Sequence, residues 1–180
     1  MRPLYPQTTI KNHNKKLKFS VSGDGDPFAS LVYRYLLTNL NVINKDIEIE
    51  IVTNGILAKS YWPKMTGIHK NVVRFKFSFD AGSELVYDQV RRGGSWNKLI
   101  NSVEYMVNWR KAYNPRMKIT SNFVVQVSNY KDMIPYVELC DNLGVDEINF
   151  QKIDNWGTFS NFNEHAVWQK NHPNHDDFLS

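Results

Sequence analysis

The stretch SGDGDPFAS, residues 22–30, places two glycines and two aspartates in front of a proline and directly after the strand-like LKFSV. Glycine permits the backbone angles of a sharp turn, and aspartate followed by proline is typical of a helix start. We therefore predict Asp26 as an N-cap and a helix from Pro27 to about Asn41. A carboxylate at this turn can also bind a cationic amino group through charge-assisted hydrogen bonds. The alternative is a tight strand–helix connection without a ligand.

The turn belongs to a pattern that recurs along the chain. Strand-like segments begin at Leu17, Ile47, Val72, Met117 and Glu147. The helical segments between them are predicted at 27–41, 56–65, from 83 through the amphipathic SWNKLINSVEYMVNWRKAY, and over YKDMIPYVELCDNLG, with Gly144 as a C-cap. Five strands separated by helices predict βαβ units with right-handed crossovers and a parallel sheet.

The strands alternate apolar and polar residues, as in IEIEI, residues 47–51. Strands of a sheet covered by helices on both faces are nearly all apolar, so one face of this sheet is predicted to be wet. Glu48 and Glu50 are expected to pair with charged residues of the neighbouring strands, namely Lys18, Arg74 and Lys76. The fold class is therefore α/β: a partial, TIM-like βα barrel of about five parallel strands, helices on its outer face and an open polar lumen.

Length and composition predict one domain: an irregular N-terminal segment 1–16, the partial barrel 17–153, and a polar and aromatic tail 154–180 with a short helix near 163–170. No apolar run has membrane-spanning length and no secretory signal precedes the first strand, so we expect a cytoplasmic location. The single cysteine, Cys140, excludes an internal disulfide and is expected to be a buried small hydrophobe. Basic residues are dispersed, which argues against nucleic-acid binding.

In order and spacing, the strand ends resemble the motifs of radical SAM enzymes. GDGDP, residues 23–27, resembles the GGEP-type motif of that family, with Asp24 and Gly25 in place of the glycines. TNG at 53–55 resembles the end of the family's third strand, SFDA at 78–81 the fourth, and YDQVRRGGSWNKLINSV the stretch that often follows. The resemblance runs from about Leu17 to Trp156.

This resemblance implies an S-adenosylmethionine cleft at the carboxyl ends of the strands. There the acid of the GGEP-type motif receives the amino group of the methionine moiety, and residues of the fourth strand contact the ribose or carboxylate. Neutral amides further along suit the ribose and the adenine edge. The candidate cofactor-binding residues are Asp24, Gly25, Asp26, Pro27, Thr53, Asn54, Ser78, Asp80, Asn122 and Gln151.

The family's CxxxCxxC loop, which holds a 4Fe–4S cluster, has no counterpart in these residues. We therefore expect S-adenosylmethionine as a cofactor but no cluster and no radical chemistry from this chain alone, as in a core fragment or a cluster-less relative. Whether the chain is an enzyme stays open. The alternative is a non-catalytic binding or assembly domain whose open polar lumen accepts a partner segment or a small anion. The first strand is predicted to be a sheet edge, which favours a homo-oligomer.

Other chemistry has weaker support in the sequence. His172 and His175 lack a third ligand, so we expect no metal site. Arg91 and Arg92 suit the end of a helix, and they also suit a substrate carboxylate or phosphate. A TIM-like hydrolase would need two of Asp24, Glu48 and Asp80 in one cleft with well-separated pKa values.

Overall fold

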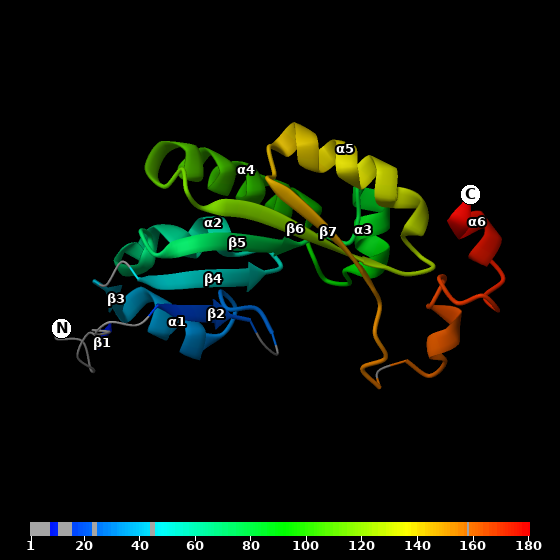
Figure 1. The fold of residues 1–180 in the computed structure, drawn as a ribbon, viewed down its shortest axis with the longest axis horizontal. Coiled ribbons are helices and arrows are strands. Elements are labelled where there is room, and N and C mark those ends of the chain that lie inside the picture. The colour runs from blue at the N-terminus through cyan, green and yellow to red at the C-terminus, as the bar shows by residue number, and fades with distance from the viewer. Residues whose placement is uncertain (1–7, 11–15, 23–24, 44–45, 158) are drawn as a thin grey trace.

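The computed structural model describes residues 8–10, 16–22, 25–43, 46–157 and 159–180. Its main sheet has five parallel strands in the order β2-β4-β5-β6-β7 (Figure 1). They are β2 (Leu17–Val21), β4 (Ile47–Thr53), β5 (Val72–Ser78), β6 (Lys118–Val125) and β7 (Glu147–Lys152). All five predicted strands are confirmed, and neighbours along the chain are neighbours in the sheet.

Helical segments connect successive strands. They are α1 (Leu31–Asn39), α2 (Ala58–Tyr61) with short 3-10 turns at Trp62–Lys64 and Thr66–Ile68, α3 (Glu84–Val90), α4 (Trp96–Tyr113), and α5 (Met133–Leu143) preceded by a 3-10 turn at Tyr130–Asp132. The αL conformation of Gly144 (φ 77°) ends α5 as predicted. This open array of parallel strands and helices is the expected partial βα barrel.

One face of the sheet forms the core with the helices. Ile47, Ile49 and Ile51 of β4 are at most 1% exposed, and Phe75 and Phe77 of β5 are fully buried. The ring centroids of these two phenylalanines lie 5.1 Å apart. Leu99, Val103 and Met106 of α4 are buried in the same cluster. Burial of one apolar row per strand accounts for the alternation in the sequence.

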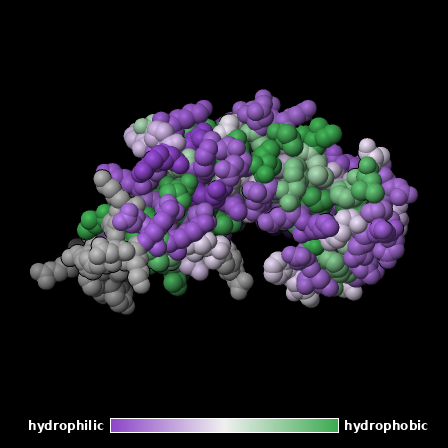
Figure 2. Space-filling model, in the orientation of Figure 1, coloured by the Kyte–Doolittle hydropathy of each residue, from purple (hydrophilic) through white to green (hydrophobic). Residues whose placement is uncertain are grey.

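The opposite, concave face carries the charged rows, as predicted. Glu50 Oε1 lies 2.9 Å from Lys18 Nζ and 3.3 Å from Arg74 Nε, so one carboxylate joins β2, β4 and β5. Arg74 continues the ladder to Glu147 of β7. Glu48 pairs with Lys16, and the expected pairing of Lys76 with a glutamate is not found among the described residues. In Figure 2 the surface over β4 and β5 is mostly hydrophilic.

The start of the first helix differs from the prediction. Helix α1 begins at Leu31 and is capped by Ser30, whose Oγ accepts a hydrogen bond from Tyr33 N at 3.3 Å. Asp26 and Pro27 belong to a separate turn, in which Asp26 O accepts from Ala29 N and Ser30 N. The prediction of Asp26 as the helix N-cap is wrong because tertiary contacts engage its carboxylate.

Two further strands and the C-terminal segment were not predicted as they stand. β1 (Thr8–Ile10) pairs in parallel with β3 (Leu40–Val42), so helix α1 ends at Asn39 and not at the predicted Asn41. Between residues 163 and 170 the chain forms turns, with a 3-10 turn at Phe162–Glu164 and helix α6 at His175–Leu179. None of the described helices is long and apolar enough to cross a membrane.

Both ends of the main sheet are edges among the described residues, with β2 at one end and β7 at the other. An edge strand offers unpaired backbone groups to another chain. Pairing of the β2 edge with a second copy stays a prediction.

Cys140 lies on α5 and is fully buried, as expected. Burial raises the pKa of its thiol to about 11. We expect no reaction of the native protein with an aromatic disulfide reagent at mildly alkaline pH, because the thiolate is the reactive species. One thiol per chain should react after unfolding in guanidinium chloride. Rapid stoichiometric labelling of the folded protein would contradict this burial.

Candidate functional site

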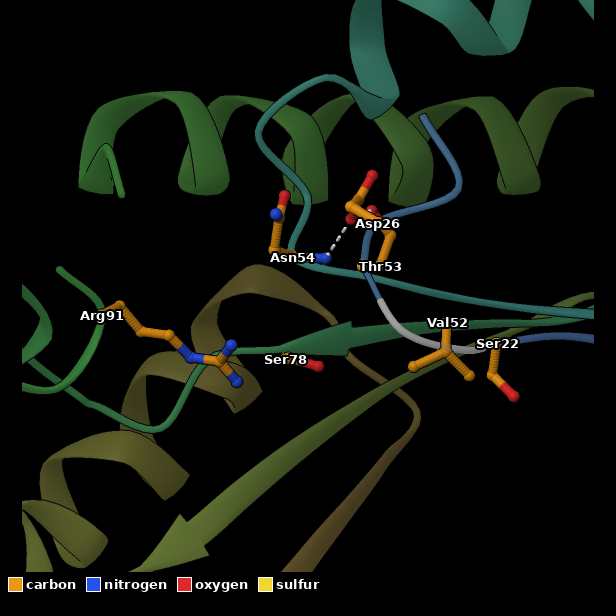
Figure 3. Close-up of a pocket in the computed structure, with 8 residues that line it drawn as sticks. Ser22, Asp26, Val52, Thr53, Asn54, Ser78 and Arg91 are labelled. Atoms are coloured by element: carbon orange, nitrogen blue, oxygen red, sulfur yellow. Dashed lines mark hydrogen bonds between the residues drawn. The ribbon is translucent and has the colours of Figure 1, made fainter. Parts of the chain in front are cut away.

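A cavity of about 360 Å³ opens at the carboxyl ends of β2, β4 and β5. In open α/β sheets ligands bind at this end, where the connecting loops converge. The residues that line it are Ser22, Gly25, Asp26, Val52, Thr53, Asn54, Ser78 and Arg91 (Figure 3). Five of the ten predicted cofactor-binding residues are therefore in one cavity.

Asp26 joins two strand ends. Its Oδ1 accepts a hydrogen bond from Phe28 N at 2.9 Å, and its Oδ2 accepts from Thr53 Oγ1 and Asn54 N, both at 2.6 Å. The first contact shapes the turn after β2, and the other two tie that turn to the end of β4. The carboxylate is thus held at the cavity wall by three donors from two loops.

The turn after β4 is built by its own short contacts. Thr53 Oγ1 accepts from Gly55 N at 3.0 Å, and Asn54 Oδ1 accepts from Ile56 N at 3.0 Å. Gly55 has φ 81°, and a Cβ there would lie 2.6 Å from Leu99 Cδ1. Only glycine fits this left-handed, closely packed position. The TNG sequence therefore presents Thr53 and Asn54 to the cavity.

Asp80, one of the predicted cofactor-binding residues, is not among the residues that line the cavity. Its side chain is 9% exposed and forms an ion pair with Arg91. Its Oδ1 accepts from Val124 N at 2.8 Å, and its carbonyl accepts from Asn129 Nδ2 at 2.9 Å. Burial raises the pKa of the Asp80 carboxyl, and the Arg91 charge opposes that rise. Asp80 has φ 62°, an uncommon conformation for a residue with a side chain.

Arg91, the ion-pair partner of Asp80, lines the cavity. It is the C-cap residue of α3, and Figure 3 shows its side chain extending toward Ser78 from the opposite side to Asp26. Its Nε is buried without a hydrogen-bond acceptor among the described residues. The cavity therefore has a carboxylate on one side and a guanidinium on the other. In the sequence, Arg91 and Arg92 after a predicted helix already indicated a group that could bind a carboxylate or phosphate.

The remaining predicted residues lie outside the cavity lining or outside the described residues. Pro27 is buried in the turn, and Asp24 falls in the undescribed pair 23–24. Asn122 is the register partner of Ser78, one strand further along, and Gln151 is exposed on the edge strand β7. The tertiary structure thus brings together the residues of β2, β4 and β5 and leaves those of β6 and β7 apart.

Two further side-chain sets do not form a site. Glu48 lies at the amino end of the sheet, beside Lys18 and Lys70, whereas Asp80 follows the carboxyl end of β5, so they cannot act together as acid and base. His172 Nε2 lies 3.3 Å from Glu164 O and its Nδ1 accepts from Asn174 N at 3.0 Å. His175 Nδ1 lies 3.3 Å from Val167 O. Both imidazoles are engaged locally.

Comparison with known proteins shows what the fold is related to. No family model matches the sequence, and no curated protein sequence matches it. SuiB of Streptococcus suis bound to S-adenosylmethionine aligns with TM-score 0.58 and 17% identity, over 79% of this chain and 31% of that one. SuiB bound to precursor peptide SuiA aligns with TM-score 0.56 and 19% identity, over 74% of this chain and 28% of that one. TYW1 with a lysine-pyruvate adduct bound aligns with TM-score 0.53 and 15% identity, over 78% of this chain and 43% of that one.

The chain therefore shares its fold with the aligned parts of SuiB and TYW1, as expected for a partial βα barrel. It spans less than half the length of each of these solved structures.

Proposed function

We propose that the cavity binds S-adenosylmethionine and that the chain is the cofactor-binding core of a radical SAM-type barrel. The observation that carries this proposal is that the carboxylate of Asp26 and the guanidinium of Arg91 lie on opposite sides of the cavity. The amino-acid end of S-adenosylmethionine is a zwitterion, so its ammonium group suits Asp26 and its carboxylate suits Arg91. The fold relationship supports the location, because one related structure holds this ligand.

The hydrogen bonding of Asp26 leaves room for the ammonium group. A carboxylate offers roughly four lone-pair sites, and three are used by Phe28 N, Thr53 Oγ1 and Asn54 N. The remaining site is held at a fixed position because the other three donors belong to backbone and strand-end groups. Such preorganisation lowers the entropic cost of binding.

Arg91 suits the carboxylate for a related reason. Its ion pair with Asp80 anchors the guanidinium, while its Nε has no acceptor among the described residues. A planar guanidinium can bind two carboxylates through different N–H groups. Ser78 offers a hydroxyl for the ribose and Val52 an apolar wall. The cavity volume of about 360 Å³ is within the usual range for small-ligand sites.

The proposal covers binding and orientation of the cofactor. A 4Fe–4S cluster needs several thiolates, and these 180 residues contain one cysteine, which is buried on α5. The residues present therefore do not fit a cluster.

Calorimetric titration tests the proposal through the amino-acid end of the ligand. We expect S-adenosylmethionine to bind the wild-type chain and methylthioadenosine, which lacks that end, to bind at least roughly tenfold more weakly. Arg91→Lys keeps a positive charge beside Asp80 but loses the planar fork, so it should weaken binding of S-adenosylmethionine and leave methylthioadenosine unaffected. Arg92→Lys, at the adjacent exposed residue, is the matched control. Equal affinities for the two ligands would contradict a zwitterion site.

A second candidate is a non-catalytic assembly or binding domain. The open β2 and β7 edges and the exposed polar face of the sheet favour it. A wild-type chain that binds neither S-adenosylmethionine nor methylthioadenosine would support this candidate over the first.

A further inference from the structure

Lys76 lies at the centre of the concave face, on the middle strand of the sheet. Its register partners are Val52 on β4 and Thr120 on β6. Val52 lines the cavity, as does Ser78, which is two residues further along β5 on the same face. Lys76 is thus one step deeper into the open barrel than the proposed cofactor site.

The other cations of this face have acidic partners. Lys18 and Arg74 both contact Glu50, Arg74 also contacts Glu147, and Lys118 Nζ lies 4.0 Å from Asp146 Oδ1. Lys76 is half-buried, and no ion pair of its ammonium group is found within the described part of the chain. A cation shielded from water without a partner is unfavourable, so an anion beside it would be stabilising.

Two polar atoms beside Lys76 also lack partners. Thr120 is fully buried and its Oγ1 has no hydrogen bond among the described residues, and the same holds for Asn122 Oδ1. Both side chains are on the concave face, because the intervening Ser121 accepts a hydrogen bond from Tyr136 of the helix layer at 2.6 Å. Buried polar groups are normally satisfied, so these two indicate a missing partner.

We propose that Lys76, with Thr120 and Asn122, forms a second ligand subsite that takes a carboxylate or phosphate group. The ammonium group provides the charge, the threonine hydroxyl a hydrogen-bond donor, and the asparagine oxygen an acceptor for a donor group next to the anion. The inference rests on the proposed function in one respect: if the cavity binds the cofactor, the anion bound at Lys76 belongs to the substrate beside it. The anion site itself does not require S-adenosylmethionine to bind.

Thermal unfolding with acetate or inorganic phosphate, at constant ionic strength, tests the subsite. We expect at least one anion to raise the melting temperature of the wild type. Lys76→Met should weaken that anion's apparent affinity roughly tenfold or more, because a charge-assisted contact is lost. Lys98→Met removes an exposed lysine on α4 and should respond as the wild type does. Arg91→Lys should also keep the response, which separates this subsite from the cofactor cavity.

Two measurements keep the test decisive. Lys76→Arg retains the charge and should retain the response, so a loss specific to Lys76→Met is not a general packing effect. Affinity of Lys76→Met for S-adenosylmethionine should match the wild type, because Lys76 does not line the cavity. The subsite is contradicted if neither anion stabilises the wild type, or if Lys76→Met responds equally. Failure of S-adenosylmethionine to bind would contradict the cofactor proposal alone.

Discussion

Replacement of Asp26 by alanine is expected to lower the free energy of unfolding by about 2–4 kcal/mol. The variant removes the acceptor of Phe28 N, Thr53 Oγ1 and Asn54 N together, and so disconnects the turn after β2 from the end of β4. Hydrogen bonds to a charged group are the strong ones, and donors left unsatisfied away from water add to the cost. Urea unfolding followed by circular dichroism measures the change.

The matched control for this variant is Asp88→Ala, which removes an exposed aspartate from α3. It should change the free energy of unfolding by less than about 0.5 kcal/mol. Asp26→Asn keeps one acceptor oxygen and the side-chain shape. Its loss of unfolding free energy should therefore lie between those of Asp26→Ala and Asp88→Ala. A cost for Asp26→Ala no larger than that of the control would show that the carboxylate does not hold the strand ends together.

The replacement Arg91→Met is expected to destabilise the protein by about 3 kcal/mol near neutral pH. It leaves the Asp80 carboxylate, 9% exposed, without the opposite charge that contacts it. Breaking one partner of a buried pair is more costly than replacing both, because the remaining charge is uncompensated. The double variant Asp80→Asn with Arg91→Met should therefore recover most of the unfolding free energy that Arg91→Met loses. Asparagine also tolerates the φ of 62° at that position.

The pH dependence of this effect follows from the direction of the Asp80 pKa. Burial raises that pKa in the folded state, so the folded protein favours the protonated carboxyl more than the unfolded chain does. The contribution of Asp80 to stability is greatest below the unfolded pKa of about 3.9 and falls as pH rises through the folded value. Loss of Arg91 raises the folded pKa further. The cost of Arg91→Met should thus be small near pH 4 and large near pH 7.

Urea titrations of the wild type, Arg91→Met and Arg92→Met at several pH values provide the measurement. Arg92 is exposed, so its variant should show no pH-dependent cost relative to the wild type. A penalty for Arg91→Met that is constant from acidic to neutral pH would contradict an unpaired Asp80 as its cause.

The sheet could be predicted from the sequence because its signal is local. A row such as Ile47, Ile49 and Ile51 has period two, and each residue is buried for the same reason. The repeated order of strand, turn and helix then leaves parallel pairing between neighbours as the simplest arrangement. The partial barrel and the carboxyl-end position of Asp26, Thr53 and Asn54 follow from that order.

The partners of Asp26, Asp80 and Arg91 were decided by tertiary structure. Asp26 and Ser30 are both good helix caps by residue type, and the contacts of Asp26 with Thr53 and Asn54, 27 and 28 residues away, select Ser30 for α1. The φ of 62° at Asp80 and the approach of Arg91 are likewise set by β6 and α3 packing around them.

By itself, then, the sequence determined the five strands of the main sheet, because burial and backbone preference act over a few neighbouring residues. It did not determine the sign of the charge opposite Asp26, since that depends on which of Asp80 and Arg91 turns toward the cavity. Only the packed structure, in which a buried carboxylate must find its counterion, places the guanidinium there.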